Sequence, residues 1–228
     1  MAFATELGRA GAILWKDLTA ERRTKANFNS VVAMAGLILL FFGFALGPDA
    51  KGLRSAAAGV LWLTVLFSGV LAFNRSYQLE LDGNALEQLL LYPGERWTLF
   101  AGKLAANLLF VFLVEVVTIP LAGIFYHVAV PALWGQVLGV LFLGTVGFVT
   151  LGTVYAAMAS RSRAREVLLP LLLFPMLVPV LIAATEATGA LLIDDPMGNA
   201  GSWIRLLATF DVIFVVASFW VFPAVIEG

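Results

Sequence analysis

Residues 26–48 read ANFNSVVAMAGLILLFFGFALGP, a run without a single Asp, Glu, Lys or Arg. The hydrocarbon core of a bilayer is about 30 Å thick, and a helix of roughly 20 apolar residues can cross it. This run is therefore long enough to be a membrane-spanning helix. Of the 228 residues in the chain, 61% are hydrophobic and only 13% are charged. Soluble domains carry about 25% charged residues, so we predict an all-α integral membrane protein.

The same criterion predicts six membrane-spanning helices in a single transmembrane domain, residues 1–228. We expect these helices at residues 29–47, 54–74, 104–127, 133–157, 167–186 and 203–226. Eleven Lys and Arg fall in the N-terminal segment and in the second and fourth connections between spans, whereas three fall on the opposite side. The positive-inside rule then places both termini in the cytoplasm.

The second connection includes residues 80–103, ELDGNALEQLLLYPGERWTLFAGK, which predict a short cytoplasmic helix. Asn84 with Glu87 three residues later is typical of a helix N-terminus, and Pro93-Gly94 ends the helix. Three leucines at i, i+3, i+4 spacing form an apolar stripe on it: Leu86, Leu89 and Leu90. We expect this helix to dock onto a partner outside the membrane. The alternative is that its leucines bind the membrane surface.

The N-terminal segment, residues 3–20, predicts an amphipathic helix that lies in the membrane interface. Its apolar residues recur at near-helical spacing, with Trp15 alongside: Phe3, Leu7, Leu14 and Leu18. Arg9 and Lys16 lie between them. The alternative is a frayed tail in the cytosol.

Motifs for catalysis and cofactor binding are absent from the sequence. There is no G-x-x-x-x-G-K-S/T, so the chain does not bind nucleotide through a P-loop. There is no cysteine, which excludes disulfides, thiolate metal sites and covalent heme attachment through C-x-x-C-H. We therefore expect no enzymatic activity, no cofactor and no metal in this chain, and membrane lipid rather than nucleic acid around it.

Three polar residues in or beside the predicted spans are candidate functional residues. Glu115 lies near the middle of the third span, where it either lines a path for cargo or protons or is hydrogen-bonded to a neighbouring helix. Asp211 lies in the sixth span, six residues after Arg205, a spacing that does not pair them on one helix face and that favours a structural role. His127 closes the third span and is either a heme ligand or a polar helix end.

Residues 74–107 carry the most specific likeness to a known family. Within them, LEQLLL at residues 86–91 is followed by Tyr92-Pro93, Arg96 and Gly102-Lys103. Other matching motifs lie before this run: Gly59-Val-Leu-Trp62, Leu71-Ala-Phe-Asn-Arg75 and Asp82-Gly83. With the chain length, the six spans and the lack of a nucleotide-binding domain, this pattern resembles the heme exporter protein B (CcmB-like) permease family.

The resemblance implies a type-2 ABC exporter-like fold in the bacterial inner (plasma) membrane. It implies a permease subunit of an ATP-driven complex for heme export or heme-chaperone release in cytochrome c maturation, with heme as the cargo of the complex. The implied partners are a cytosolic ABC ATPase subunit that binds ATP, a second copy of this chain, a heme-handling membrane subunit and a small single-span subunit.

The coupling helix would contact the ATPase through these residues: Asp82, Leu86, Glu87, Leu89, Leu90, Tyr92 and Arg96. Two other functions are compatible with the same sequence. One is an exporter half for a lipid, drug or glycan. The other is a membrane scaffold for assembly factors that transports nothing.

Overall fold

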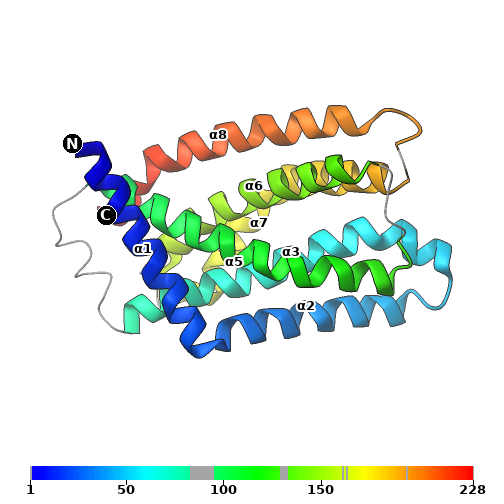
Figure 1. Cartoon of the computed structure of the whole chain (residues 1–228), viewed down its shortest axis with the longest axis horizontal. Helices are drawn as coiled ribbons and strands as arrows, with labels where there is room; N and C mark the ends of the chain where they lie inside the picture. The colour runs from blue at the N-terminus through cyan, green and yellow to red at the C-terminus, as the bar shows by residue number, and fades with distance from the viewer. Residues whose placement is uncertain are drawn as a thin grey trace.

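The computed structural model of the chain describes residues 2–82, 95–128, 133–160, 162, 164–193 and 195–227. Its helices follow in this order: α1 (Ala2–Thr24), α2 (Ala26–Ala45), α3 (Ala50–Asp82), α5 (Arg96–Phe125), α6 (Trp134–Ser160), α7 (Arg165–Leu192) and α8 (Ala200–Glu227). All except α1 run lengthwise in one bundle, and α1 crosses one end of that bundle (Figure 1).

The structure contains six helices that are long and apolar enough to cross a membrane: Ala26–Ala45, Ala50–Asn74, Arg96–Phe125, Trp134–Ser160, Glu166–Leu192 and Ala200–Ile226. The predictions of an all-α membrane protein and of six spans are therefore confirmed over the described residues. Each of the six spans passes at least one of its predicted limits, and α3 and α5 do so most, because α3 continues to Asp82 and α5 already begins at Arg96. A charged residue ends an apolar run without interrupting the backbone hydrogen bonds of a helix, so a helix can continue past the bilayer core.

The two helices that flank the predicted coupling helix meet the same end of the bundle. The last turn of α3 and the first turn of α5 lie at the end that α1 crosses, where the chain also terminates (Figure 1). Residues 83–94 lie outside the described part of the chain, and with them the predicted docking residues Leu86, Glu87, Leu89, Leu90 and Tyr92. That this end faces the cytoplasm stays a prediction.

The first helix, α1, is helical over the whole predicted range and continues to Thr24. Lys25 then turns the chain into α2 with a left-handed backbone conformation, φ 51°. Just beyond this turn, the Phe28 amide donates a hydrogen bond of 2.7 Å to Glu21 Oε1. The side chains of Leu7 and Trp15 are 52% and 67% exposed, which suits a helix at a membrane surface. The location of α1 in the membrane interface stays a prediction.

The centre of the bundle is formed where α3 packs on α6. Aromatic rings lie directly on glycine backbones along this contact: Trp62 on Gly144, Phe73 on Gly152 and Phe148 on Gly69. A Cβ at any of these glycines would overlap the ring that covers it. The absence of side chains at these positions therefore lets the two helices approach closely, as small residues do in membrane bundles generally.

The most proline-rich span, α7, is one continuous helix in spite of Pro170, Pro175 and Pro179. Its inward side is an apolar stripe of completely buried residues: Leu169, Leu173, Leu177, Val180, Ala183, Ala184, Ala187 and Leu191. This stripe contacts α3, α6 and α8. Packing on three sides holds the helix together at positions where proline removes backbone hydrogen bonds.

Candidate functional site

The end of the bundle that α1 crosses contains a buried cation, Lys103 on α5. Only 1% of Lys103 is exposed. Its Nζ lies 3.0 Å from Asp17 Oδ2 of α1 and donates a hydrogen bond of 3.4 Å to the Ser76 carbonyl of α3. Lys16 Nζ lies 3.2 Å from the other carboxylate oxygen of Asp17. We call Lys16, Asp17, Ser76 and Lys103 the Lys103 cluster.

A cavity of about 210 Å³ adjoins this cluster, at the meeting of α1, α2, α3 and α5. Lys16, Asp17 and Ser76 line it, together with Asn107 one turn farther along α5. The Asn107 side-chain amide also donates a hydrogen bond of 3.0 Å to Thr153 Oγ1 of α6. Near this end of the bundle, polar contacts thus join α1 to α5 at Lys103 and α5 to α6 at Asn107.

Of the predicted docking residues, the described part of the chain includes Asp82 and Arg96. Asp82 is the last residue of α3, and Arg96 is the first of α5. Glu95, before Arg96, accepts a hydrogen bond of 2.7 Å at its carbonyl from Thr98 Oγ1. Asp82 and Arg96 therefore mark where the two flanking helices end and begin. Their contact with a partner stays a prediction.

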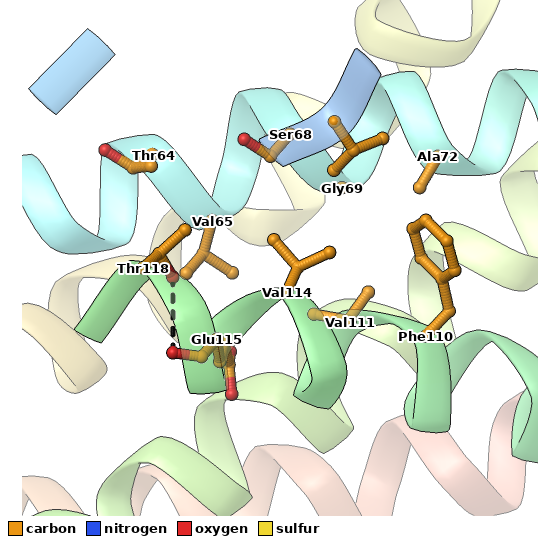
Figure 2. A pocket seen from close by; sticks show the side chains of 11 residues that line it. Thr64, Val65, Ser68, Gly69, Ala72, Phe110, Val111, Val114, Glu115 and Thr118 are labelled. Carbon is orange, nitrogen blue, oxygen red and sulfur yellow. Dashed lines mark hydrogen bonds between the residues drawn. The ribbon is translucent and has the colours of Figure 1, made fainter. Parts of the chain in front are cut away.

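Glu115 is buried in the middle of α5, with 3% of its surface exposed. Thr145 of α6 donates a hydrogen bond of 2.5 Å to Glu115 Oε1. The residue also borders a pocket of about 10 Å³ between α3 and α5, but Figure 2 shows its carboxyl pointing away from Thr64 and Ser68 on the far wall. A pocket of this volume holds about one water molecule. The structure thus places Glu115 in a hydrogen bond between α5 and α6, and a role in a path for cargo or protons stays a prediction.

Asp211 is buried on α8 with 5% of its surface exposed. Neither of its carboxyl oxygens has a hydrogen-bond partner among the described residues. The carboxyl lies against Gly147 of α6, where a Cβ would overlap Oδ1. Arg205 of the same helix donates a hydrogen bond of 3.2 Å to Ser202 Oγ instead of approaching Asp211. A buried carboxyl without a partner is destabilising in a bilayer interior.

His127 lies just beyond α5, with a positive φ of 53° and an exposed side chain. Its backbone carbonyl accepts a hydrogen bond of 3.1 Å from Arg54 Nη2 of α3. No group of three or more His, Cys, Asp or Glu that could hold a metal ion occurs in the described ranges. The contact recorded for His127 is made by its backbone, and heme ligation by its imidazole stays a prediction.

Sequence reasoning missed the Lys103 cluster. Lys103 was assigned to the connection before the third span, and its acidic partner lies in a helix expected to lie on the membrane surface. One signal was present in the sequence: Lys103 stands within an apolar segment, between Leu99-Phe100 and Leu104. A cation inside an apolar helix generally has a buried partner, and the nearest carboxylates are then candidates.

Comparison with known proteins reveals relatives over most of the chain. A family model described as CcmB protein matches residues 9–228. Heme exporter protein B of Haemophilus influenzae is 30% identical, over 82% of this chain and 84% of the relative. The protein of the same name in Rhodobacter capsulatus is 31% identical over 77% and 80%, respectively. That of Escherichia coli K12 is 29% identical over 90% and 97%.

Proposed function

The chain belongs to the CcmB protein family, and from this membership we propose that it is a membrane permease subunit of an ATP-driven heme export system for cytochrome c maturation. The observation that carries the proposal is the family match over residues 9–228. The six-helix bundle supports it, because a permease subunit must span the bilayer several times. Heme is the cargo of the complex, and ATP hydrolysis drives heme export or release of a heme-loaded chaperone.

The ATP is bound by a separate cytosolic subunit. The sequence has no P-loop, so energy must reach this chain through a contact with a partner. Residues 80–103 suit that contact, because α3 ends and α5 begins at the end of the bundle where α1 lies (Figure 1). We place the coupling helix between the end of α3 and the start of α5, in a type-2 ABC exporter-like arrangement.

The coupling helix binds the ATPase subunit by inserting an apolar stripe into a groove, a recurring mode of helix recognition. Leu86, Leu89 and Leu90 form the stripe. Burying three leucines stabilises a complex by several kcal/mol before the costs of association, at about 25 cal/mol per Å². The polar residues around the stripe give the contact its orientation: Asp82, Glu87, Tyr92 and Arg96.

We propose the remaining partners from the same family membership. A second copy of this chain completes the membrane pathway, and a heme-handling membrane subunit and a small single-span subunit complete the assembly. The complex lies in the bacterial inner membrane with both termini of this chain in the cytoplasm, in agreement with the excess of Lys and Arg on that side. We assign no heme ligand to this chain.

Two variants test the docking contact. Leu89→Asp places a charge in the apolar stripe, whereas Gln88→Asp places the same charge on the opposite face of the predicted helix. We expect Leu89→Asp to abolish copurification of the ATPase subunit. It should also fail to restore c-type cytochromes when it is expressed in a strain that lacks the gene. Gln88→Asp should retain both the copurified ATPase and cytochrome formation. If Leu89→Asp keeps the ATPase bound and cytochromes form normally, the coupling helix is not at these residues. If the deletion strain itself forms c-type cytochromes, the cargo assignment is wrong.

A further inference from the structure

The burial of Lys103 is unusual for its residue type. Lysine is almost never fully buried unless it is paired, because its ammonium group loses hydration. Lys103 is nevertheless among the largest fully buried side chains of the described chain, at 1% exposure. Its ion pair with Asp17 and its hydrogen bond to the Ser76 carbonyl compensate for this loss. A leucine or methionine would fill such a position without these requirements, so the charge calls for an explanation.

The contacts of Lys103 join three helices. The residue belongs to α5, Asp17 belongs to α1, and Ser76 belongs to α3. Ser76 lies six residues before the end of α3, and Lys103 lies seven residues after the start of α5. A helix rises 1.5 Å per residue, so the contact between Lys103 of α5 and Ser76 of α3 lies about 10 Å from the end of α3 and from the start of α5.

Gly102, next to Lys103, brings α1 into close contact with the same turn of α5. A Cβ on Gly102 would fall 2.8 Å from the Ala10 carbonyl and 2.8 Å from Ile13 Cβ, both on α1. There is consequently no room for a side chain between α1 and this turn of α5. Since α1 also contacts α5 far more than it contacts α2, its position is set mainly by the start of α5.

We propose that Lys103 is a positioning residue: by pairing with Asp17 it fixes the two helices that carry the coupling segment against α1. The proposal rests on the function proposed above. Through Lys103, a displacement of residues 83–94 by the ATPase subunit moves α1, α3 and α5 together. Without the pair, the ATPase still binds, but its movement is not passed on to the bundle.

The test uses two disruptive variants and two controls. Lys103→Met keeps the length of the side chain but removes its charge, and Asp17→Asn leaves Lys103 in place with a neutral acceptor. Lys103→Arg is the conservative variant, because it keeps a cation beside Asp17. Glu6→Gln is the matched control, since it breaks a different α1 ion pair, Arg9 Nη1 to Glu6 Oε1 at 2.6 Å, whose members are less buried than Lys103.

The functional readout compares cytochrome formation with assembly. We expect Lys103→Met and Asp17→Asn to retain the subunit and its copurified ATPase while c-type cytochromes fall about tenfold, within the range by which mutations alter coupling between sites. Lys103→Arg and Glu6→Gln should retain cytochrome formation. Normal cytochrome levels in both disruptive variants would overturn the proposal. So would a loss of cytochromes that merely follows a loss of subunit or of bound ATPase, because Lys103 would then be needed only for folding.

A geometric readout tests the positioning role without reference to heme. The chain has no cysteine, so spin labels can be attached to Leu7→Cys on α1 and Leu109→Cys on α5, where both side chains are exposed. We expect pulsed electron paramagnetic resonance to give one narrow distance distribution, which broadens in Lys103→Met and Asp17→Asn but not in Glu6→Gln. An unchanged distribution overturns the positioning role. If the deletion strain forms normal cytochromes but the distribution broadens, the proposed function fails and the positioning role of Lys103 stands.

Discussion

The indole Nε1 of Trp62 on α3 donates a hydrogen bond of 3.0 Å to Thr188 Oγ1 on α7 in the interior of the bundle. Both residues are about 1% exposed. The ring of the same tryptophan lies on Gly144 of α6. Trp62 thus connects three membrane-spanning helices, through its indole nitrogen on one side and the outer edge of its six-membered ring on another.

Replacement of Thr188 by valine should weaken this connection. Thr188→Val keeps the shape of the side chain but leaves a buried indole N–H without its acceptor, which costs about 1 kcal/mol in membrane proteins. Thr209→Val is the control, because the Thr209 hydroxyl donates to the Arg205 carbonyl of its own helix at an exposed position. Thermal unfolding in detergent should show a lower midpoint for Thr188→Val alone. Equal midpoints for the two variants would contradict a stabilising role for the Trp62 hydrogen bond.

A methyl group at Gly144 should be more damaging than one at Gly139 of the same helix. Gly144→Ala places a Cβ inside the volume of the Trp62 ring, and overpacking of this kind typically costs about 1–3 kcal/mol. Gly139→Ala is the matched control, since no heavy atom lies within 4 Å of the position its Cβ would take. The free energy of unfolding should fall for Gly144→Ala and stay unchanged or rise for Gly139→Ala. A harmless Gly144→Ala would mean that the ring can move aside.

The hydrogen bond between Thr145 and Glu115 should contribute to the stability of the α5–α6 contact. Thr145→Val removes the hydroxyl that donates a hydrogen bond to Glu115 Oε1. We expect the free energy of unfolding to fall by about 1–2 kcal/mol. Thr150→Val is the control on the same helix, because Thr150 Oγ1 is buried and has no hydrogen-bond partner among the described residues. Glu115→Gln retains an acceptor oxygen and should be close to the parent in both stability and cytochrome formation. If Glu115→Gln keeps its stability but abolishes cytochrome formation, Glu115 has a functional role.

Removal of the carboxyl of Asp211 should stabilise the bundle. Both oxygens of this buried carboxyl lack hydrogen-bond partners among the described residues, and an apolar side chain of similar size avoids the cost of such an unsatisfied group, about 1–3 kcal/mol. Asp211→Leu should therefore unfold at a higher temperature than the parent. Asp195→Ala should have the opposite effect, because the Asp195 carboxylate accepts hydrogen bonds from the Asn199 and Ala200 amides at the start of α8. A destabilised Asp211→Leu would indicate that Asp211 has a partner in the assembled complex.

The membrane spans were predictable because each depends on a local property of the sequence. A helix that crosses a bilayer needs one apolar run of fixed length, and residues 26–48 are such a run, of which α2 occupies Ala26–Ala45. The limits of α3 and α5 were not predictable in the same way. Hydropathy falls at Arg75 and Lys103, but the helical hydrogen bonds continue to Asp82 in one case and begin at Arg96 in the other.

The polar contacts were not predictable beyond their first members. The sequence identifies Glu115 as an intramembrane carboxyl, but a threonine within an uncharged run gives no sign of its orientation, so Thr145 was missed. Lys103 was counted among the charges of a connection. Its burial depends on Asp17, which reaches it through the tertiary packing of α1 on α5, and no local pattern encodes that packing.

The rings that lie on glycines between α3 and α6 have a mechanical consequence. The three rings, of Trp62, Phe73 and Phe148, lie on their glycines at successive levels along the two helices. One helix therefore cannot slide along the other unless all three rings move off their glycines together. The two helices, α3 and α6, therefore move as one rigid unit. Since α3 ends at Asp82, directly before the predicted coupling helix, a displacement of that end would be carried along the length of α3 with α6 attached. Any relative motion of the helices must then occur at helix–helix contacts other than the one between α3 and α6.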